Sequence, residues 1–285
     1  MKKHKRAVDI VVISDVHLGT FGCHAKELLH YLKSIKPKIV VLNGDIIDIW
    51  QFSKSYWPKS HMKVARHLIG WISKGVKTYY VTGNHDEMFR KFAGLKLGSA
   101  RIVNKVILDL PNDKKAWIFH GDVFDVTMQH SKWLAKLGAI GYDTLILINS
   151  FANFISEKVF KKGKLSLSKK IKNSVKSAVK FINNFEQTSA DIGISNYYDY
   201  VICGHIHHPE MKVMSNQHGS ITYLNSGDWV ENLSALEFKN GEWTIFKFND
   251  EDRINMILNE KNEEADLNNE QLFENLVEEF NLLRS

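Results

Sequence analysis

The 285-residue sequence is poor in cysteine and proline, with two and four of them respectively, and it has no tract rich in glycine and serine. Cys23 and Cys203 lie in unlike segments, which excludes a disulfide framework and favours a reducing cytoplasm. The lack of flexible tracts argues against two domains joined by a linker. No apolar run approaches the roughly 20 residues that a membrane-spanning helix needs.

The composition is that of a globular protein, with 44% apolar and 25% charged residues. The net charge of +6 is unevenly distributed, because residues 250–285 hold eleven acidic and three basic residues. We therefore predict one large domain at 1–249 followed by an acidic tail at 250–285. Leu272, Leu276 and Phe280 recur at helical spacing, which predicts that the tail is partly helical.

Five short apolar runs each end on polar residues of metal-binding types. These runs are residues 8–13, 39–42, 76–81, 116–119 and 200–203. Helical periodicity at 26–34 and 62–73 separates the first three, which predicts an α/β sheet. In such sheets the ligand site lies beyond the carboxyl ends of the strands, where all these polar residues fall.

Later segments have the pattern of hairpins. Residues 103–108 and 116–119 flank turn residues, and strand-like runs at 221–224, 235–238 and 243–248 follow further along the chain. We predict a two-sheet sandwich flanked by helices.

Between about 123 and 196 the strand pattern stops and helical periodicity replaces it. This stretch separates two of the metal-binding motifs described below, so we predict a helical insertion over the active site. Four lysines there lie largely away from the apolar helical face: Lys169, Lys172, Lys176 and Lys180. We expect this cap to rest on an anionic membrane surface, the plain alternative being a solvated helix packed on the domain.

The polar strand ends form five motifs, and a chance Asp-x-His alone would mean little. They are Asp15-x-His17, Gly44-Asp45-x-x-Asp48, Gly83-Asn84-His85-Asp86, His120-Gly121-Asp122 and Gly204-His205-x-His207. Oxygen donors mixed with imidazoles suit Mn, Fe or Zn, and the absence of cysteine argues against a structural zinc site. Two such ions can polarise phosphoryl oxygens and activate water at neutral pH. Asp48 and Asp86 are expected to orient the imidazole ligands from outside.

Together the five motifs resemble those of the calcineurin-like metallophosphoesterase family, over residues 8–248. The resemblance implies two divalent ions, Mn²⁺ in the first place and Fe or Zn as alternatives. It assigns Asp15, His17 and His207 to one ion, and Asn84, His120 and His205 to the other. Asp45 would bridge the ions, and His85 would lie beside the substrate phosphate as a cation or general acid. The residues expected to take part in catalysis are therefore His85, Asp15 and Asp45.

The stretches 14–19, 44–48 and 204–209, and His120-Gly121-Asp122 followed by a helical insertion, are most similar to one branch of the family. This branch is that of the UDP-2,3-diacylglucosamine hydrolases, which act in lipid A assembly. This implies a lipid-linked nucleotide-diphosphate substrate and a peripheral place on the cytoplasmic face of the cell membrane. One position departs from the branch, which has Arg where this chain has His85, and this leaves the substrate open.

Three alternatives remain: a phosphodiesterase acting on another phospholipid headgroup, a nuclease, and a metal-dependent binding scaffold. The basic balance favours a nuclease, but the sequence shows no groove pattern of interleaved aromatic residues, so we expect no nucleic-acid partner. The sequence leaves the oligomeric state open.

Overall fold

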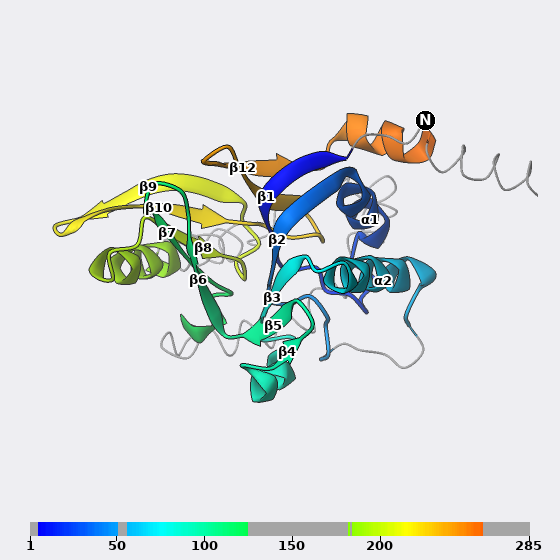
Figure 1. Cartoon of the computed structure of the whole chain (residues 1–285), viewed down its shortest axis with the longest axis horizontal. Coiled ribbons are helices and arrows are strands. Elements are labelled where there is room, and N and C mark those ends of the chain that lie inside the picture. The colour runs from blue at the N-terminus through cyan, green and yellow to red at the C-terminus, as the bar shows by residue number, and fades with distance from the viewer. Residues whose placement is uncertain (1–4, 51–55, 125–181, 183, 259–285) are drawn as a thin grey trace, which may run out of the picture.

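The computed structural model describes residues 5–50, 56–124, 182 and 184–258 (Figure 1). The four lysines of the expected cap, most of the expected insertion and residues 259–285 of the acidic tail lie outside the described residues. Residues 184–195, at the end of the expected insertion, are helical, and so are residues 250–258 at the start of the tail.

The first sheet has seven strands in the order β12-β11-β1-β2-β3-β5-β4. Their bounds are β1 (Arg6–Ile13), β2 (Ile35–Asn43), β3 (Lys77–Val81), β4 (Lys96–Leu97), β5 (Ala100–Val103), β11 (Ser234–Lys239) and β12 (Glu242–Lys247). Strands β1, β2, β3 and β5 pair in parallel, whereas β11 is antiparallel to β1. The carboxyl ends of β1, β2 and β3 therefore share one edge.

The second sheet has five strands in the order β6-β7-β8-β10-β9. Their bounds are β6 (Lys105–Asp109), β7 (Lys115–Phe119), β8 (Tyr200–Cys203), β9 (Glu210–Asn216) and β10 (Gly219–Asn225). The two sheets pack through apolar side chains such as Val12 and Val41 on one side and Ile118, Ile202 and Leu224 on the other. The predicted α/β sandwich of two sheets is confirmed.

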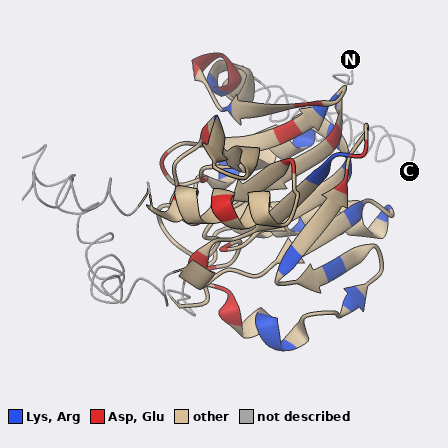
Figure 2. Ribbon diagram, turned by 90° about the vertical axis from the view of Figure 1, so that its left-hand side faces the viewer, with Lys and Arg blue, Asp and Glu red and all other residues tan. Residues whose placement is uncertain are grey.

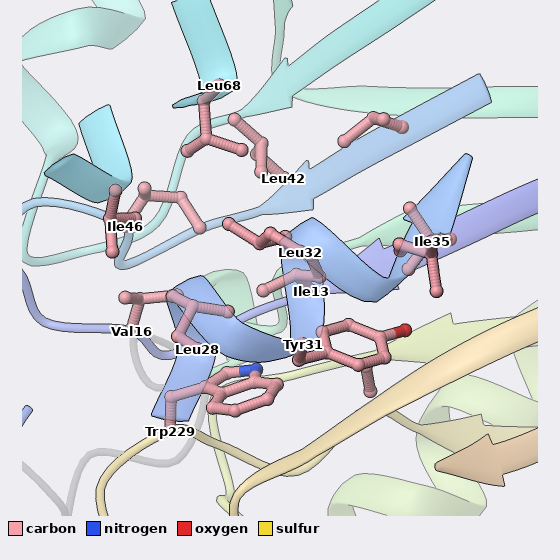
Figure 3. Close-up of a cluster of buried hydrophobic side chains, with 14 of the residues drawn as sticks. Ile13, Val16, Leu28, Tyr31, Leu32, Ile35, Leu42, Ile46, Leu68 and Trp229 are labelled. Carbon is pink, nitrogen blue, oxygen red and sulfur yellow. The ribbon is translucent and has the colours of Figure 1, made fainter. Parts of the chain in front are cut away.

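Helices α1 (Ala25–Ser34) and α2 (Lys59–Ser73) pack on the first sheet (Figure 1). Successive strand residues point to opposite faces, so in β1 Val12 contacts the second sheet while Ile13 joins the cluster under the helices. Figure 3 shows Leu28 and Leu32 of α1 beside Ile13 in that cluster. Trp229 fills its lower edge with no exposed surface, so it is a core residue.

A third apolar cluster lies on the other face of the second sheet, under the helix at 184–195. Phe185 and Ile194 of this helix pack there against Val201 and Tyr223.

The structure corrects one strand assignment made from the pattern and places another run in its sheet. Val103 belongs to β5 of the first sheet, because it pairs with Val81 of β3, and the hairpin of the second sheet begins only at Lys105. The run at 221–224 lies in the second sheet as β10, apart from the β11–β12 hairpin. Both placements depend on pairing partners that are distant in the sequence.

Candidate metal centre

The strand ends of both sheets deliver the five motifs to one place. Asp15 follows β1 and Asp45 follows β2, while His120 follows β7 and His205 follows β8. Asn84 comes three residues after the end of β3. Because these strands run parallel within their sheets and the sheets pack face to face, the five motifs meet at one edge of the sandwich.

The backbone at this edge has a left-handed conformation at five of the seven predicted metal ligands. Their φ angles are 52° at Asp15, 53° at His17, 53° at Asp45, 67° at His205 and 54° at His207. For residues other than glycine this costs on the order of 1–3 kcal/mol each and is concentrated at functional sites. Interlocking hydrogen bonds maintain it, since the Asp15 N–H donates to the Gly44 carbonyl and the His17 N–H donates to the Asp45 carbonyl.

Two glycines of the motifs let facing ligands approach. A Cβ on Gly44 would lie 2.3 Å from Nδ1 of His120, and one on Gly83 would lie 2.2 Å from Oδ1 of Asp45. Gly44 also has a φ of +81°, which L-residues with a Cβ rarely adopt. The glycines are therefore required by the packing of the ligands behind them.

The first cluster of ligand atoms is formed by Asp15, His17 and His207, all within 4.8 Å of one another. Nε2 of His207 lies 3.1 Å from Oδ1 of Asp15. Nε2 of His17 is buried and has no hydrogen-bond partner in the described part of the chain. A buried polar atom without a partner is costly, and a cation bound there would satisfy it. These residues fit a divalent ion.

The second cluster is formed by Asp45, His120 and His205, again with ligand atoms within 4.8 Å of one another. Nδ1 of His120 lies 2.8 Å from the Asn43 carbonyl, which makes Nδ1 the donor and leaves Nε2 as the acceptor of a neutral ring. That Nε2 faces Oδ2 of Asp45 at 3.2 Å and Oδ1 of Asn84 at 3.3 Å. Three acceptors that converge in this way need a cation or a proton among them.

Asp45 lies between the clusters. Its side chain faces His120, its Oδ1 accepts from the backbone N–H of His85 at 2.9 Å, and its carbonyl accepts from the His17 N–H. The bridging role of Asp45 is consistent with this position and remains a prediction.

The charges of the site compensate one another. Burial would raise the pKa of Asp15, but the positive charges of His207 and His120 outweigh it and lower that pKa to about 2. Burial would likewise lower the pKa of His207, and Asp15 instead raises it to about 9. The pKa of His120 is raised well above its usual value despite its burial, because of Asp45 and Asp15. In the absence of metal, protons balance the carboxylates.

A third group joins His85 to the first cluster. Oδ2 of Asp48 lies 2.8 Å from Nδ1 of His85 and 3.2 Å from Nδ1 of His17. Burial would lower the pKa of His85, but Asp48 and then Asp45 raise it above its usual value. The His85 ring is also in contact with the partly exposed Trp50, with centroids 4.8 Å apart. Asp48 thus lies where the sequence predicts an orienting carboxylate.

The partners of Asp86 differ from the prediction. Its carboxylate accepts hydrogen bonds mainly from backbone N–H groups, and not from an imidazole. Its carboxylate accepts from the N–H groups of Gly83 at 2.7 Å and Ile46 at 3.0 Å, and from the Tyr80 hydroxyl at 2.6 Å. It therefore fixes the loops that carry Asp45 and Asn84 relative to one another.

Sequence patterns missed supporting residues behind His207. Oδ2 of the buried Asp228 lies 3.9 Å from Nδ1 of His207, and the same atom accepts from the Asn232 amide at 2.6 Å. Asn232 also donates to the His207 carbonyl at 2.7 Å. The only local signal was an Asp four residues after the strand-like run at 221–224, which lies outside the five motifs.

The Metallophos family model, described as calcineurin-like phosphoesterase, matches residues 8–209. A UDP-2,3-diacylglucosamine hydrolase of Blochmanniella pennsylvanica is 23% identical over 81% of this chain and 92% of that protein. One of Blochmanniella floridana is 25% identical over 85% and 98%. The solved structure of a dimetal phosphatase from Danio rerio is 11% identical, covers 84% and 95%, and has a TM-score of 0.41. With its matched motifs at one edge of the sandwich, the chain belongs to the calcineurin-like phosphoesterase family.

Proposed function

We propose that the protein is a dinuclear metal phosphohydrolase that cleaves the pyrophosphate bond of a nucleotide-diphosphate lipid such as UDP-2,3-diacylglucosamine. The observation that carries this proposal is the pair of neighbouring ligand clusters, Asp15 with His17 and His207, and Asp45 with His120 and His205. A single structural ion would need only one of them.

The ligands divide as the family pattern implies. Asp15, His17 and His207 would hold one ion, Asn84, His120 and His205 would hold the other, and Asp45 lies between the two sets of ligands. Mn²⁺ is the proposed ion because it accepts oxygen and imidazole ligands together. When bound, such ions would supply charge neutralisation at the phosphoryl oxygens and an activated water molecule.

His85 supplies a proton. Because Nδ1 of His85 lies 2.8 Å from Oδ2 of Asp48, we assign the other ring nitrogen, Nε2, to the substrate. Asp48 raises the pKa of His85 and so favours the protonated ring, from which Nε2 can donate to the phosphate oxygen that leaves as the P–O bond breaks. Asp48 then stabilises the orientation of the ring in both protonation states.

The proposal also names a lipid substrate and a place for the enzyme at the membrane. Support comes from relatives named UDP-2,3-diacylglucosamine hydrolase, which this chain matches over four fifths of its length or more. In the described part of the chain, no helix is long and apolar enough to span a membrane. We place the enzyme on the cytoplasmic face of the membrane, with residues 123–196 as a lysine-bearing cap that receives the lipid.

A substrate panel assayed with Mn²⁺ tests the proposal. It contains UDP-2,3-diacylglucosamine, soluble nucleotide-diphosphate sugars, phospholipids and single-stranded DNA, with Asp45→Ala as the inactive control. Preferred cleavage of the first compound, yielding UMP and the lipid monophosphate, supports the proposal. Preference for DNA would make the protein a nuclease, and preference for a phospholipid would replace the proposed substrate.

A further inference from the structure

An eleven-residue segment beside the metal centre exposes four large apolar side chains. It spans the 3-10 helix η1 (Glu87–Phe92), the turn that follows and the strand β4. The exposed fractions are 49% for Met88, 49% for Phe92, 45% for Leu95 and 58% for Leu97. Single exposed apolar residues are ordinary, but four in so short a segment indicate a surface that is covered by something else.

The same segment is basic. Residues 87–105 hold five lysines and arginines and one acidic residue. Arg90 forms an ion pair with Asp122, so its charge is compensated within the protein. Lys91, Lys96 and Arg101 are exposed beside the apolar side chains. Figure 2 shows blue segments along the lower edge of the molecule, where η1, β4 and β5 lie in Figure 1.

Backbone hydrogen bonds hold this segment in place. Leu95 donates to the Phe92 carbonyl at 3.0 Å, Gly94 donates to the Ile102 carbonyl at 2.8 Å, and Ile102 donates to the Leu95 carbonyl at 3.0 Å. Strand β4 then pairs with β5 through Lys96 and Arg101. The apolar side chains are therefore presented on a formed scaffold, and exposing them requires no unfolding.

The position of the segment relates it to the metal centre. Helix η1 begins two residues after His85, and Arg90 joins it to Asp122, two residues after His120. A surface held by these two loops lies at the rim of the site.

We propose that Met88, Phe92, Leu95 and Leu97, with Lys91, Lys96 and Arg101, form a membrane-docking surface for an anionic lipid bilayer. We call it the η1–β4 surface. Anionic lipid surfaces are bound by apolar side chains that enter the headgroup region, together with exposed basic residues that lie beside them. A partner protein strand fits less well, because β4 has two residues and one is Lys96, features that discourage edge pairing.

The inference rests on the proposed function in one respect, namely that docking would bring a lipid-bearing substrate to the site. Docking itself requires no turnover. It is therefore measured by co-sedimentation of the full chain with vesicles, either phosphatidylcholine alone or phosphatidylcholine mixed with phosphatidylglycerol.

Two double variants test the two components of the surface. Phe92→Ser with Leu97→Ser removes apolar contact, and Lys91→Glu with Lys96→Glu reverses charge. Each is expected to weaken binding to the anionic vesicles at least about tenfold. Binding of the unmodified chain should weaken as salt increases, because exposed charges are screened.

The matched control is Met211→Ser with Val213→Ser on β9, whose side chains are 45% and 72% exposed on the edge of the other sheet. This variant should bind vesicles like the unmodified chain. All variants should keep their melting temperature and their turnover of bis(p-nitrophenyl) phosphate, which needs no membrane.

Equal vesicle binding by all variants would overturn the proposal, as would equal weakening by the β9 control. A change of oligomeric state in the Phe92/Leu97 variant, seen by light scattering without vesicles, would assign the surface to a second copy of the chain instead. If vesicle binding behaves as expected but no lipid substrate is cleaved, the proposed function fails and the docking surface stands.

Discussion

Oδ2 of Asp48 lies 2.8 Å from Nδ1 of His85, and the same oxygen lies 3.2 Å from Nδ1 of His17. One buried carboxylate thus lies close to both a predicted metal ligand and the predicted proton donor, as its predicted orienting role requires. This geometry makes the substitution of Asp48 informative, because its two effects can be measured separately.

Asp48→Asn is expected to lower turnover about 10- to 100-fold, the usual effect of losing a carboxylate behind an imidazole ligand. Asp48 raises the pKa of His85, so the substitution lowers that pKa. If protonated His85 is the active form, activity is lost as pH rises through its pKa. The alkaline limb of the pH–rate profile should therefore shift to lower pH. An unshifted limb would separate Asp48 from His85, and Asp9→Asn, at an exposed pair with Lys38, serves as the neutral control.

His85→Ala should keep both metal ions and lose about 10²- to 10⁴-fold in turnover, the range for a general acid. Metal content by elemental analysis and kcat measured from acid to alkaline pH check this. Kinetics that match those of the unmodified enzyme at every pH would make His85 a structural residue.

Asp45→Ala and His120→Ala should each lose metal and lower turnover about 10³-fold or more, since both charge neutralisation and water activation depend on the ions. Circular dichroism should show the secondary structure retained. If either variant bound two ions per chain with nearly normal turnover, the ligand assignment would be wrong.

Gly83→Ala and Gly70→Ala form a matched pair. A Cβ at position 83 would lie 2.2 Å from Oδ1 of Asp45, whereas one at position 70 in α2 would meet nothing within 4 Å. We expect Gly83→Ala to displace Asp45, reduce metal binding and cost about 1–3 kcal/mol of stability. Gly70→Ala should leave activity unchanged and stabilise the protein by about 0.5–1 kcal/mol, because alanine favours a helix interior. Thermal unfolding and metal titration measure both, and similar behaviour of the two variants would contradict the close packing.

Metal binding should release protons at neutral pH. In the metal-free protein the pKa of His207 is about 9, because Asp15 outweighs burial, so the ring is protonated below that pH. A metal ion binds the neutral ring and must displace this proton, and the apparent affinity should rise with pH up to about 9. Calorimetry in buffers of different ionisation enthalpy counts the protons. His207→Gln should release fewer, and an enthalpy independent of the buffer would rule the mechanism out.

The sequence by itself determined most of the elements and the metal-binding types of residue at their ends. Strand and helix patterns depend only on residues that are neighbours in the sequence. For that reason the runs that precede Asp15, Asp45 and His120 could be recognised locally. The α/β class followed from their alternation. The predicted types of metal ligand followed from residues two or three positions apart.

The tertiary structure decided which residues distant in the sequence come into contact. Val103 does not belong to the predicted hairpin, because it pairs with Val81 of the first sheet. The carboxylate of Asp86 accepts hydrogen bonds from the Gly83 N–H and the Tyr80 hydroxyl, where a contact with an imidazole had been expected. Asp228 supports His207 across 21 residues of chain, and nothing in local periodicity encodes such a contact. Pairing and packing select partners by shape and charge once the sheets have formed, so these contacts are set only when the sandwich has assembled.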